Sequence, residues 1–144
     1  VADPGAELVA RAYAAGLQVQ VLAGPSSLLM ALAASGLNGQ SFAFVGYLPQ
    51  EAAARSARIR ETEGLSRRYG QTQICIETPY RNAAVFNALV ENLTPATRLS
   101  LSVGLTLANA FSRSESVARW RQLSPEQRPA LSDKLPAVFC WLAA

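Results

Sequence analysis

The sequence contains no histidine and only two cysteines. The lack of histidine excludes Ser-His-Asp triads, histidine general bases and histidine metal sites within this chain. Cys75 and Cys140 are too few for a disulfide framework or a structural zinc site, and both lie in apolar segments. We therefore expect two reduced thiols in the core of a cytoplasmic protein, and no metal.

Long hydrophobic runs and a strong excess of charge are absent as well. The apolar segment at residues 28–34 is too short to span a bilayer, and no signal peptide is recognisable. Charged residues make up 16% of the chain, and the net charge is +3. These features predict a globular protein with no membrane partner. Because the first residue is Val1 and a helix start follows directly, we interpret the sequence as a fragment that lacks its amino-terminal part.

What is present is an alternation of helical and strand patterns in a chain that is half hydrophobic and long enough for one core. The patterns predict helices at residues 3–16, 28–35, 50–69 (with a break at Gly64), 79–93 and 117–123. They predict strands at residues 19–22, 42–45, 72–77, 99–103, 110–116 and 135–142, and a polar loop at 124–134. Strands separated by helices indicate an α/β fold, with a mixed, largely parallel sheet flanked by helices.

The first helix shows how local chemistry sets these boundaries. Asp3-Pro4 favours a helix start, because aspartate caps free N–H groups and proline fits the first turn. Leu8, Val9 and Tyr13 give an apolar stripe, and Gly16 is typical of a helix end. The helix is therefore expected to need a surface to pack against.

Three turns that follow strands carry residues suited to ligand binding. In α/β sheets, ligands bind beyond the carboxyl ends of strands. The first turn is Gly24-Pro25-Ser26-Ser27, where glycine permits a close approach and a helix amino terminus offers free N–H groups. From the residues alone an ordinary helix cap is the preferred interpretation, because short Gly-Pro-Ser strings are common. The third turn, Gly104-Leu105-Thr106, is a weaker signal of the same kind.

The second turn is the most polar of the three. Glu77-Thr78-Pro79-Tyr80-Arg81 places a carboxylate at a strand end, directly before a helix. Glu77 and Arg81 are four residues apart, so they are able to form an ion pair across the helix start. Ligand contact by the carboxylate and the arginine is the other interpretation, and the residues alone leave both open.

A cluster of basic residues supplies the excess of positive charge. It comprises five arginines, offset locally by Glu61 and Glu63: Arg55, Arg58, Arg60, Arg67 and Arg68. A polyanion such as RNA binds such a cluster by releasing counterions. A solvated helix face explains the same pattern.

Four strings, in order along the chain, resemble one family. Residues 1–9 look like its "SDPG…LV" segment, and residues 22–37 look like its "LPGPSA…ALAASGL" stretch. Residues 44–49 are similar to its "F.GFLP" motif, and residues 77–81 to "E(A/S)P(H/Y)R". Together they resemble the tetrapyrrole methylase family of S-adenosylmethionine-dependent methyltransferases, on the branch that modifies ribosomal RNA.

The resemblance implies a two-domain enzyme, usually a homodimer, with S-adenosyl-L-methionine in the cleft between the domains. On this view residues 1–23 are the tail of a truncated amino-terminal domain, and residues 24–144 are the carboxyl-terminal methyltransferase domain. Such a fragment alone is expected to be inactive. The resemblance assigns cofactor contacts to ten residues: Pro25, Ser26, Ser27, Glu77, Thr78, Gly104, Leu105, Leu135, Pro136 and Ala137. It also makes Glu77 the candidate catalytic base and places Tyr80 and Arg81 toward the substrate.

One departure from the family bears on the substrate. The ribosomal branch carries "ELTK" where this sequence has Gly104-Leu105-Thr106-Leu107, so both charges are missing. A ribosomal RNA substrate is the leading interpretation, and tetrapyrrole methylation is an alternative. A non-catalytic RNA-binding or dimerisation module is the third, supported by the arginine cluster. In every enzyme interpretation Ser26, Glu77 and Ala137 are expected to line one slot.

Overall fold

The computed structural model describes residues 5–129, 131 and 134–144 as one mixed sheet with helices on both faces. The elements follow one another as α1 (Ala6–Ala14), α2 (Ser27–Ser35), β1 (Phe42–Gly46), α3 (Ala52–Tyr69), β2 (Thr72–Glu77), the 3₁₀ turn η1 (Pro79–Arg81), α4 (Asn82–Asn92), β3 (Arg98–Val103), β4 (Phe111–Ser116), α5 (Val117–Gln122), the 3₁₀ turn η2 (Pro125–Gln127) and β5 (Ala137–Leu142).

The five strands lie in the order β1-β2-β5-β3-β4. The pairing of β1 with β2 is parallel, whereas β5 is antiparallel to both β2 and β3, and β3 is antiparallel to β4. The α/β class and the mixed sheet expected from the sequence are confirmed. The expectation that the sheet is largely parallel is wrong, because only one of the four strand pairings is parallel. The last strand enters between β2 and β3 in the opposite direction, which local patterns do not encode.

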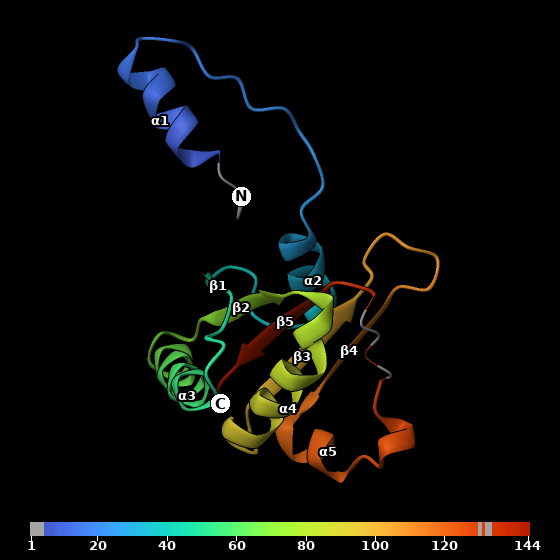
Figure 1. Cartoon of the computed structure of the whole chain (residues 1–144). Helices are drawn as coiled ribbons and strands as arrows, with labels where there is room; N and C mark the ends of the chain where they lie inside the picture. The colour runs from blue at the N-terminus through green and yellow to red at the C-terminus, as the bar shows by residue number, and fades with distance from the viewer. Residues whose placement is uncertain (1–4, 130, 132–133) are drawn as a thin grey trace.

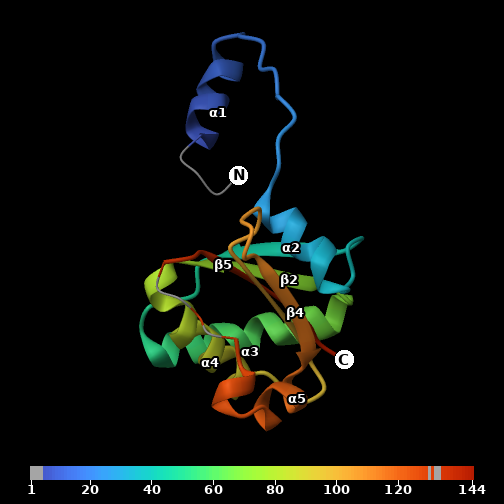
Figure 2. The ribbon, with the colours of Figure 1, turned by 90° about the vertical axis from the view of Figure 1, so that its right-hand side faces the viewer.

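Two apolar layers hold the helices to the sheet. On one face α2 packs over Ile74, Val138 and Cys140. On the other face α3, α4 and α5 cover a larger core that includes Leu101, Phe139 and both tryptophans. Figure 2 shows this division, with α2 on one side of the sheet and α3, α4 and α5 on the other. The strand alternation decides it, since successive side chains point to opposite faces.

The first helix stands apart from this body. Figure 1 shows α1 joined to α2 by an extended segment and lying away from the sheet. No residue of α1 is buried, and Leu8 and Tyr13 are 72% and 63% exposed. The helix and its end near Gly16 were predicted correctly. The cap expected at Asp3-Pro4 lies outside the described residues.

The strand predicted at residues 19–22 is wrong. Residues 17–26 form no helix or strand, and Val21 and Leu22 are 89% and 81% exposed. A strand exists only where a neighbouring strand completes its hydrogen bonds, and the described part of the chain brings none beside it. The break expected in α3 at Gly64 is absent from that helix as well, because α3 runs unbroken to Gly70, whose left-handed φ of 59° ends it.

Both thiols are buried and unpaired with each other, as expected. Burial raises the pKa of Cys140 to about 12. Burial also raises the pKa of Cys75 well above its usual range, with smaller contributions from Cys140 and Glu77. An unfolded thiol ionises near pH 8.5, so between that pH and about 12 the unfolded state alone loses these protons.

Stability is therefore expected to fall as the pH rises above about 9. Each buried thiol contributes a slope of about 1.4 kcal/mol per pH unit, because the folded state keeps protons that the unfolded state releases. Urea unfolding at pH 8 and pH 10 measures the fall. The double variant Cys75→Ala/Cys140→Ala is the control, and it should show a clearly shallower dependence. Equal slopes in the two proteins would contradict the assignment.

Candidate functional site

The sheet register brings the functional turns to one edge. Glu77 at the end of β2 and Val103 at the end of β3 both pair with Ala137, the first residue of β5. Because β2 and β3 run in the same direction on either side of β5, the turns that follow them meet the turn that precedes β5. The end of β1 lies at the same edge, since β1 is parallel to β2.

A cavity of about 180 Å³ opens at this edge. Its lining combines an apolar wall with a carboxylate and hydroxyls: Ser27, Tyr47, Ile76, Glu77, Ser102, Leu105, Pro136, Ala137 and Val138. The residues come from α2, three strands and the loops between them. The family resemblance predicts cofactor contacts for five of these residues: Ser27, Glu77, Leu105, Pro136 and Ala137.

A wider hollow of about 540 Å³ adjoins this cavity. It is formed by the segment that enters α2 and by the end of β2: Leu22, Gly24, Pro25, Ser26, Ser27, Leu28 and Ile76. Ser27 and Ile76 line both spaces, so the two lie side by side. Ser26 borders the hollow, Glu77 and Ala137 border the cavity, and the two adjoining spaces together are called the composite slot.

The turn before α2 presents backbone groups to this slot. Ser26 is the residue that precedes the helix, and its side chain makes no capping bond with the described residues. Its carbonyl instead accepts the first helical hydrogen bond, from Met30 N at 3.0 Å. The hydroxyl of Ser26 is thus not used to cap the helix, and the N–H groups of the first turn have no partner within the helix.

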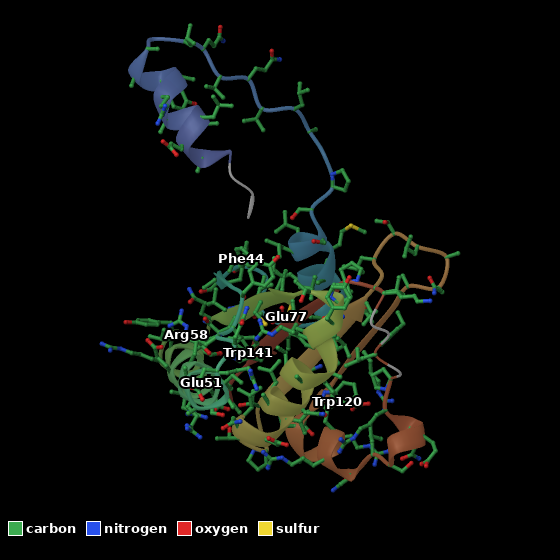
Figure 3. All side chains as sticks on the ribbon, viewed as in Figure 1. Phe44, Glu51, Arg58, Glu77, Trp120 and Trp141 are labelled. Carbon is green, nitrogen blue, oxygen red and sulfur yellow. The ribbon has the colours of Figure 1, made fainter. Side chains whose placement is uncertain are left out.

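Glu77 is the most constrained residue of the site. Its side chain is 1% exposed, and one oxygen, Oε1, accepts hydrogen bonds from Thr78 N at 2.7 Å and Thr78 Oγ1 at 3.2 Å. The other oxygen, Oε2, lies 3.1 Å from Arg81 Nη1, so the ion pair predicted across the helix start is present. Figure 3 shows Glu77 on the sheet, between the helices of the two faces.

Arg81 and Tyr80 lie differently with respect to the cavity. Besides pairing with Glu77, Arg81 donates to the carbonyls of Pro49 at 3.1 Å and Leu48 at 3.3 Å, which ties the loop after β1 to the start of α4. Tyr80 is 84% exposed and lines neither space. Arg81 therefore stabilises the turn at the site without lining either space, whereas Tyr80 is exposed and lies outside the lining.

The remaining predicted residues lie beside the cavity. Gly104 has a φ of 61° and donates its N–H to Pro136 O at 3.1 Å. A Cβ at this glycine would lie 3.3 Å from Leu135 Cδ1, so the close approach of the two loops depends on glycine. Leu135 packs against the larger core, and Thr78 is occupied with Glu77. Thr106, with a φ of 78°, is strained for a residue that carries a Cβ.

Four lining residues were not singled out by the sequence: Tyr47, Ile76, Ser102 and Val138. Ile76, Ser102 and Val138 appear as ordinary strand residues, and only the pairing of β2, β3 and β5 turns them toward one space. Tyr47 carried a signal, because it lies in the string Phe44-Val45-Gly46-Tyr47-Leu48-Pro49 that resembles a family motif.

The arginine cluster belongs to α3, on the other face of the sheet from α2. Arg58 pairs with Glu61 at 2.7 Å, Arg60 donates to Asn92 Oδ1 at 2.9 Å, and Arg55 donates to Gln50 O at 2.8 Å. Figure 3 shows Arg58 on the outer side of this helix. Most of these arginines thus form bonds within α3 or to the segments beside it. None of them lines the slot.

Among the described residues, no helix has the length and hydropathy needed to span a membrane. In the same part of the chain, no three His, Cys, Asp or Glu side chains converge in a way that suits a metal ion.

Comparison with known proteins gives relatives of one kind. No protein-family model matches the chain. A protein of Mycobacterium tuberculosis named ribosomal RNA small subunit methyltransferase I is 39% identical over 106 residues, which are 74% of this chain and 36% of that protein. Its namesake from Vibrio cholerae is 41% identical over 81 residues, 56% of this chain and 27% of that protein. The chain spans about a third of the length of the curated relatives it matches.

Solved structures share the fold. The methyltransferase CobJ superposes with a TM-score of 0.55 at 18% identity, covering 95% of this chain and 56% of that protein. A conserved hypothetical protein of Aeropyrum pernix gives 0.58 at 18% identity, covering 99% and 54%. Uroporphyrin-III-C-methyltransferase of Thermus thermophilus gives 0.51 at 19% identity, covering 97% and 58%.

Fold and sequence point to methyltransferases. The chain shares the fold of the methyltransferase CobJ and of a uroporphyrin-III-C-methyltransferase. Its sequence is similar to part of the proteins named ribosomal RNA small subunit methyltransferase I.

Proposed function

We propose that this chain is the carboxyl-terminal part of an S-adenosyl-L-methionine-dependent methyltransferase that acts on ribosomal RNA in the cytoplasm. The observation that carries the proposal is the composite slot, where turns from four separate segments meet beside a buried carboxylate. The relatives named as ribosomal RNA methyltransferases support the reaction and the substrate.

The lining fits a nucleoside with an amino acid attached. Ile76, Leu105 and Val138 provide an apolar wall for a flat base, while Ser27 and Ser102 bring hydroxyls for a ribose or an amino acid group. When bound, the cofactor supplies an activated methyl group on sulfur. The contribution of this chain is orientation, since an in-line displacement depends on holding the two reactants in register.

Glu77 has two possible duties in this scheme. Its contacts with Thr78 and Arg81 hold the turn that forms the floor of the slot. Its carboxylate also borders the cavity, and we keep it as the candidate base that accepts the proton of a ribose hydroxyl.

The proposal includes a second wall for the slot. The apolar side chains of α1 and of the segment after it are exposed, among them Leu8, Tyr13, Leu17 and Val21. A group of exposed apolar side chains is normally covered by another part of the protein or by a partner. We place residues 1–23 at the end of an amino-terminal domain and residues 24–144 in the carboxyl-terminal domain, and we propose a homodimer, as the family resemblance implies.

The test is binding of S-adenosylhomocysteine, the demethylated cofactor, to the complete protein by titration calorimetry. Saturable binding is expected, and Ser27→Phe should weaken it at least tenfold, because the added ring would occupy the cavity beside Ile76. Leu29→Phe is the matched control, since Leu29 lies on the same helix, is 54% exposed and lines neither space. Absence of binding, or equal weakening by both variants, would sink the proposal. Transfer of labelled methyl to a tetrapyrrole and not to ribosomal RNA would overturn the substrate.

A further inference from the structure

Exposed aromatic and apolar side chains follow the strand ends at this edge of the sheet. Tyr47 after β1, Tyr80 after β2 and Leu107 after β3 have 57%, 84% and 48% of their surfaces exposed, and of the three Tyr47 lines the cavity. In the third of these turns Gly104-Leu105-Thr106-Leu107 carries no charge. A substrate that enters here therefore meets faces for stacking and few ionic partners.

Tyr47 is set at this rim by a distortion of β1. The register of β1 on β2 shifts between Phe44 and Gly46, and Gly46 has a φ of 74°. Such a bulge re-aims the next side chain, and bulges of this kind are frequent beside active sites. As a result Tyr47 leaves the plane of the sheet, lines the cavity with Glu77 and Leu105, and still keeps more than half of its surface in solvent.

The backbone around Tyr47 is held firmly. The carbonyls of Leu48 and Pro49, the next residues, accept from Arg81, and Leu48 is only 2% exposed. Tyr47 therefore presents a half-exposed aromatic ring from an anchored backbone. The same ring is well suited to receive a flat partner, since little conformational freedom is lost on contact.

We infer that Tyr47 is a stacking platform for an unpaired nucleobase of the RNA, so that this protein takes single-stranded and not duplex RNA at the rim of its slot. The inference rests on the proposed function, because it places an RNA substrate at this edge of the sheet. Bases in a duplex are stacked on each other and hide their faces, whereas unpaired bases stack on aromatic side chains.

The experiment measures binding of a fluorescent single-stranded RNA of about 12 nucleotides to the complete protein, and of the same RNA annealed to its complement. Single-stranded RNA is expected to bind more tightly. Tyr47→Leu should weaken its binding about 5- to 100-fold, the range for one stacked base, while Tyr47→Phe should stay within about twofold. Tyr69→Leu is the matched control, because Tyr69 is 56% exposed but lies at the end of α3.

The outcomes separate this inference from the proposed function. Calorimetry with S-adenosylhomocysteine is run on each variant, and Tyr47→Leu should weaken RNA binding by a larger factor than it weakens the analogue, because Tyr47 also lines the cavity. If Tyr47→Leu weakens the cofactor analogue and not the RNA, the ring serves the cofactor and the inference fails while the proposed function stands. Equal effects of Tyr47→Leu and Tyr69→Leu, or equal affinity for duplex, would also overturn it. A Tyr47-dependent preference for single strands without any analogue binding would support the platform and refute the methyltransferase.

Discussion

Replacing Arg81 with methionine is expected to destabilise the chain by about 2–3 kcal/mol, and most of that loss should return when Glu77 is changed to glutamine as well. Glu77 is nearly fully buried, and Arg81 is its ionic partner at 3.1 Å. Removing the arginine leaves a buried carboxylate without compensation, which costs more than the pair itself contributes. The expected loss of stability is smaller than for a fully buried ion pair, because a quarter of the Arg81 side chain is in solvent.

Urea unfolding of the single variants and the double variant gives the coupling energy. Arg11→Met is the control, because Arg11 pairs with Glu7 at the same spacing on the exposed helix α1 and should change stability by less than about 0.5 kcal/mol. Glutamine at position 77 is still able to accept from Thr78, so the double variant keeps the turn. If the double variant binds S-adenosylhomocysteine but transfers methyl groups more slowly than the single variant Arg81→Met, Glu77 acts as the base. Independent, additive effects would show that the pair does not hold the turn.

Replacing Trp120 with alanine is expected to cost about 3–5 kcal/mol, a large fraction of the stability of a domain of this size. The side chain is fully buried and joins three elements. Its ring meets Phe86 of α4 edge-on at 5.1 Å, its indole N–H donates to Leu99 O of β3 at 2.9 Å, and Arg113 of β4 lies 5.1 Å from its face. Alanine would leave a large cavity and remove the indole hydrogen bond to Leu99 O at the same time.

The second tryptophan supplies the matched comparison. Trp141 is equally buried, but its indole nitrogen has no hydrogen-bond partner among the described residues. Trp120→Phe should therefore cost about 1–2 kcal/mol more than Trp141→Phe, since only the first change removes a buried hydrogen bond. Far-ultraviolet circular dichroism follows unfolding in both variants without depending on the tryptophans. Equal costs would mean that the bond to Leu99 adds nothing.

The consequence for function is that stability and binding are divided between the two faces of the sheet. Trp120 and the larger core lie under α3, α4 and α5, whereas the slot opens at the strand ends, beside α2. Variants of the larger core other than those at Ala137, which belongs to both, should therefore change unfolding without altering the lining. Glu77 and Arg81 are the exception, because they hold both the start of α4 and the floor of the slot.

The local chemistry of the sequence is sufficient for most elements. Helices end at three glycines with positive φ, as their conformational freedom suggests: Gly16, Gly36 and Gly70. The alternation at Leu99, Leu101 and Val103 predicts a strand with one face in the larger core, and the structure has it. The Glu77–Arg81 pair also follows from spacing alone. Each of these features depends on residues within a few positions of one another, which is why a single sequence is enough to predict them.

Features that depend on distant partners could not be obtained in this way. The segment at residues 19–22 has a strand pattern but no neighbouring strand within the described chain, so it stays irregular. The arginine cluster has a net charge in the sequence, yet Glu63, one of its two acids, is buried and accepts from Thr94, while Arg58 and Arg60 are engaged with other side chains.

The sequence by itself determined the α/β class, the family resemblance and the turns that carry the candidate site, because these depend on local patterns and short strings. Only the tertiary structure decided that the slot exists. The insertion of β5 between β2 and β3 brings Glu77, Leu105 and Ala137 to one cavity, and the bulge before Tyr47 adds an aromatic ring to its rim. Strand order and register are set by packing between segments far apart in the chain, and no local pattern contains that information.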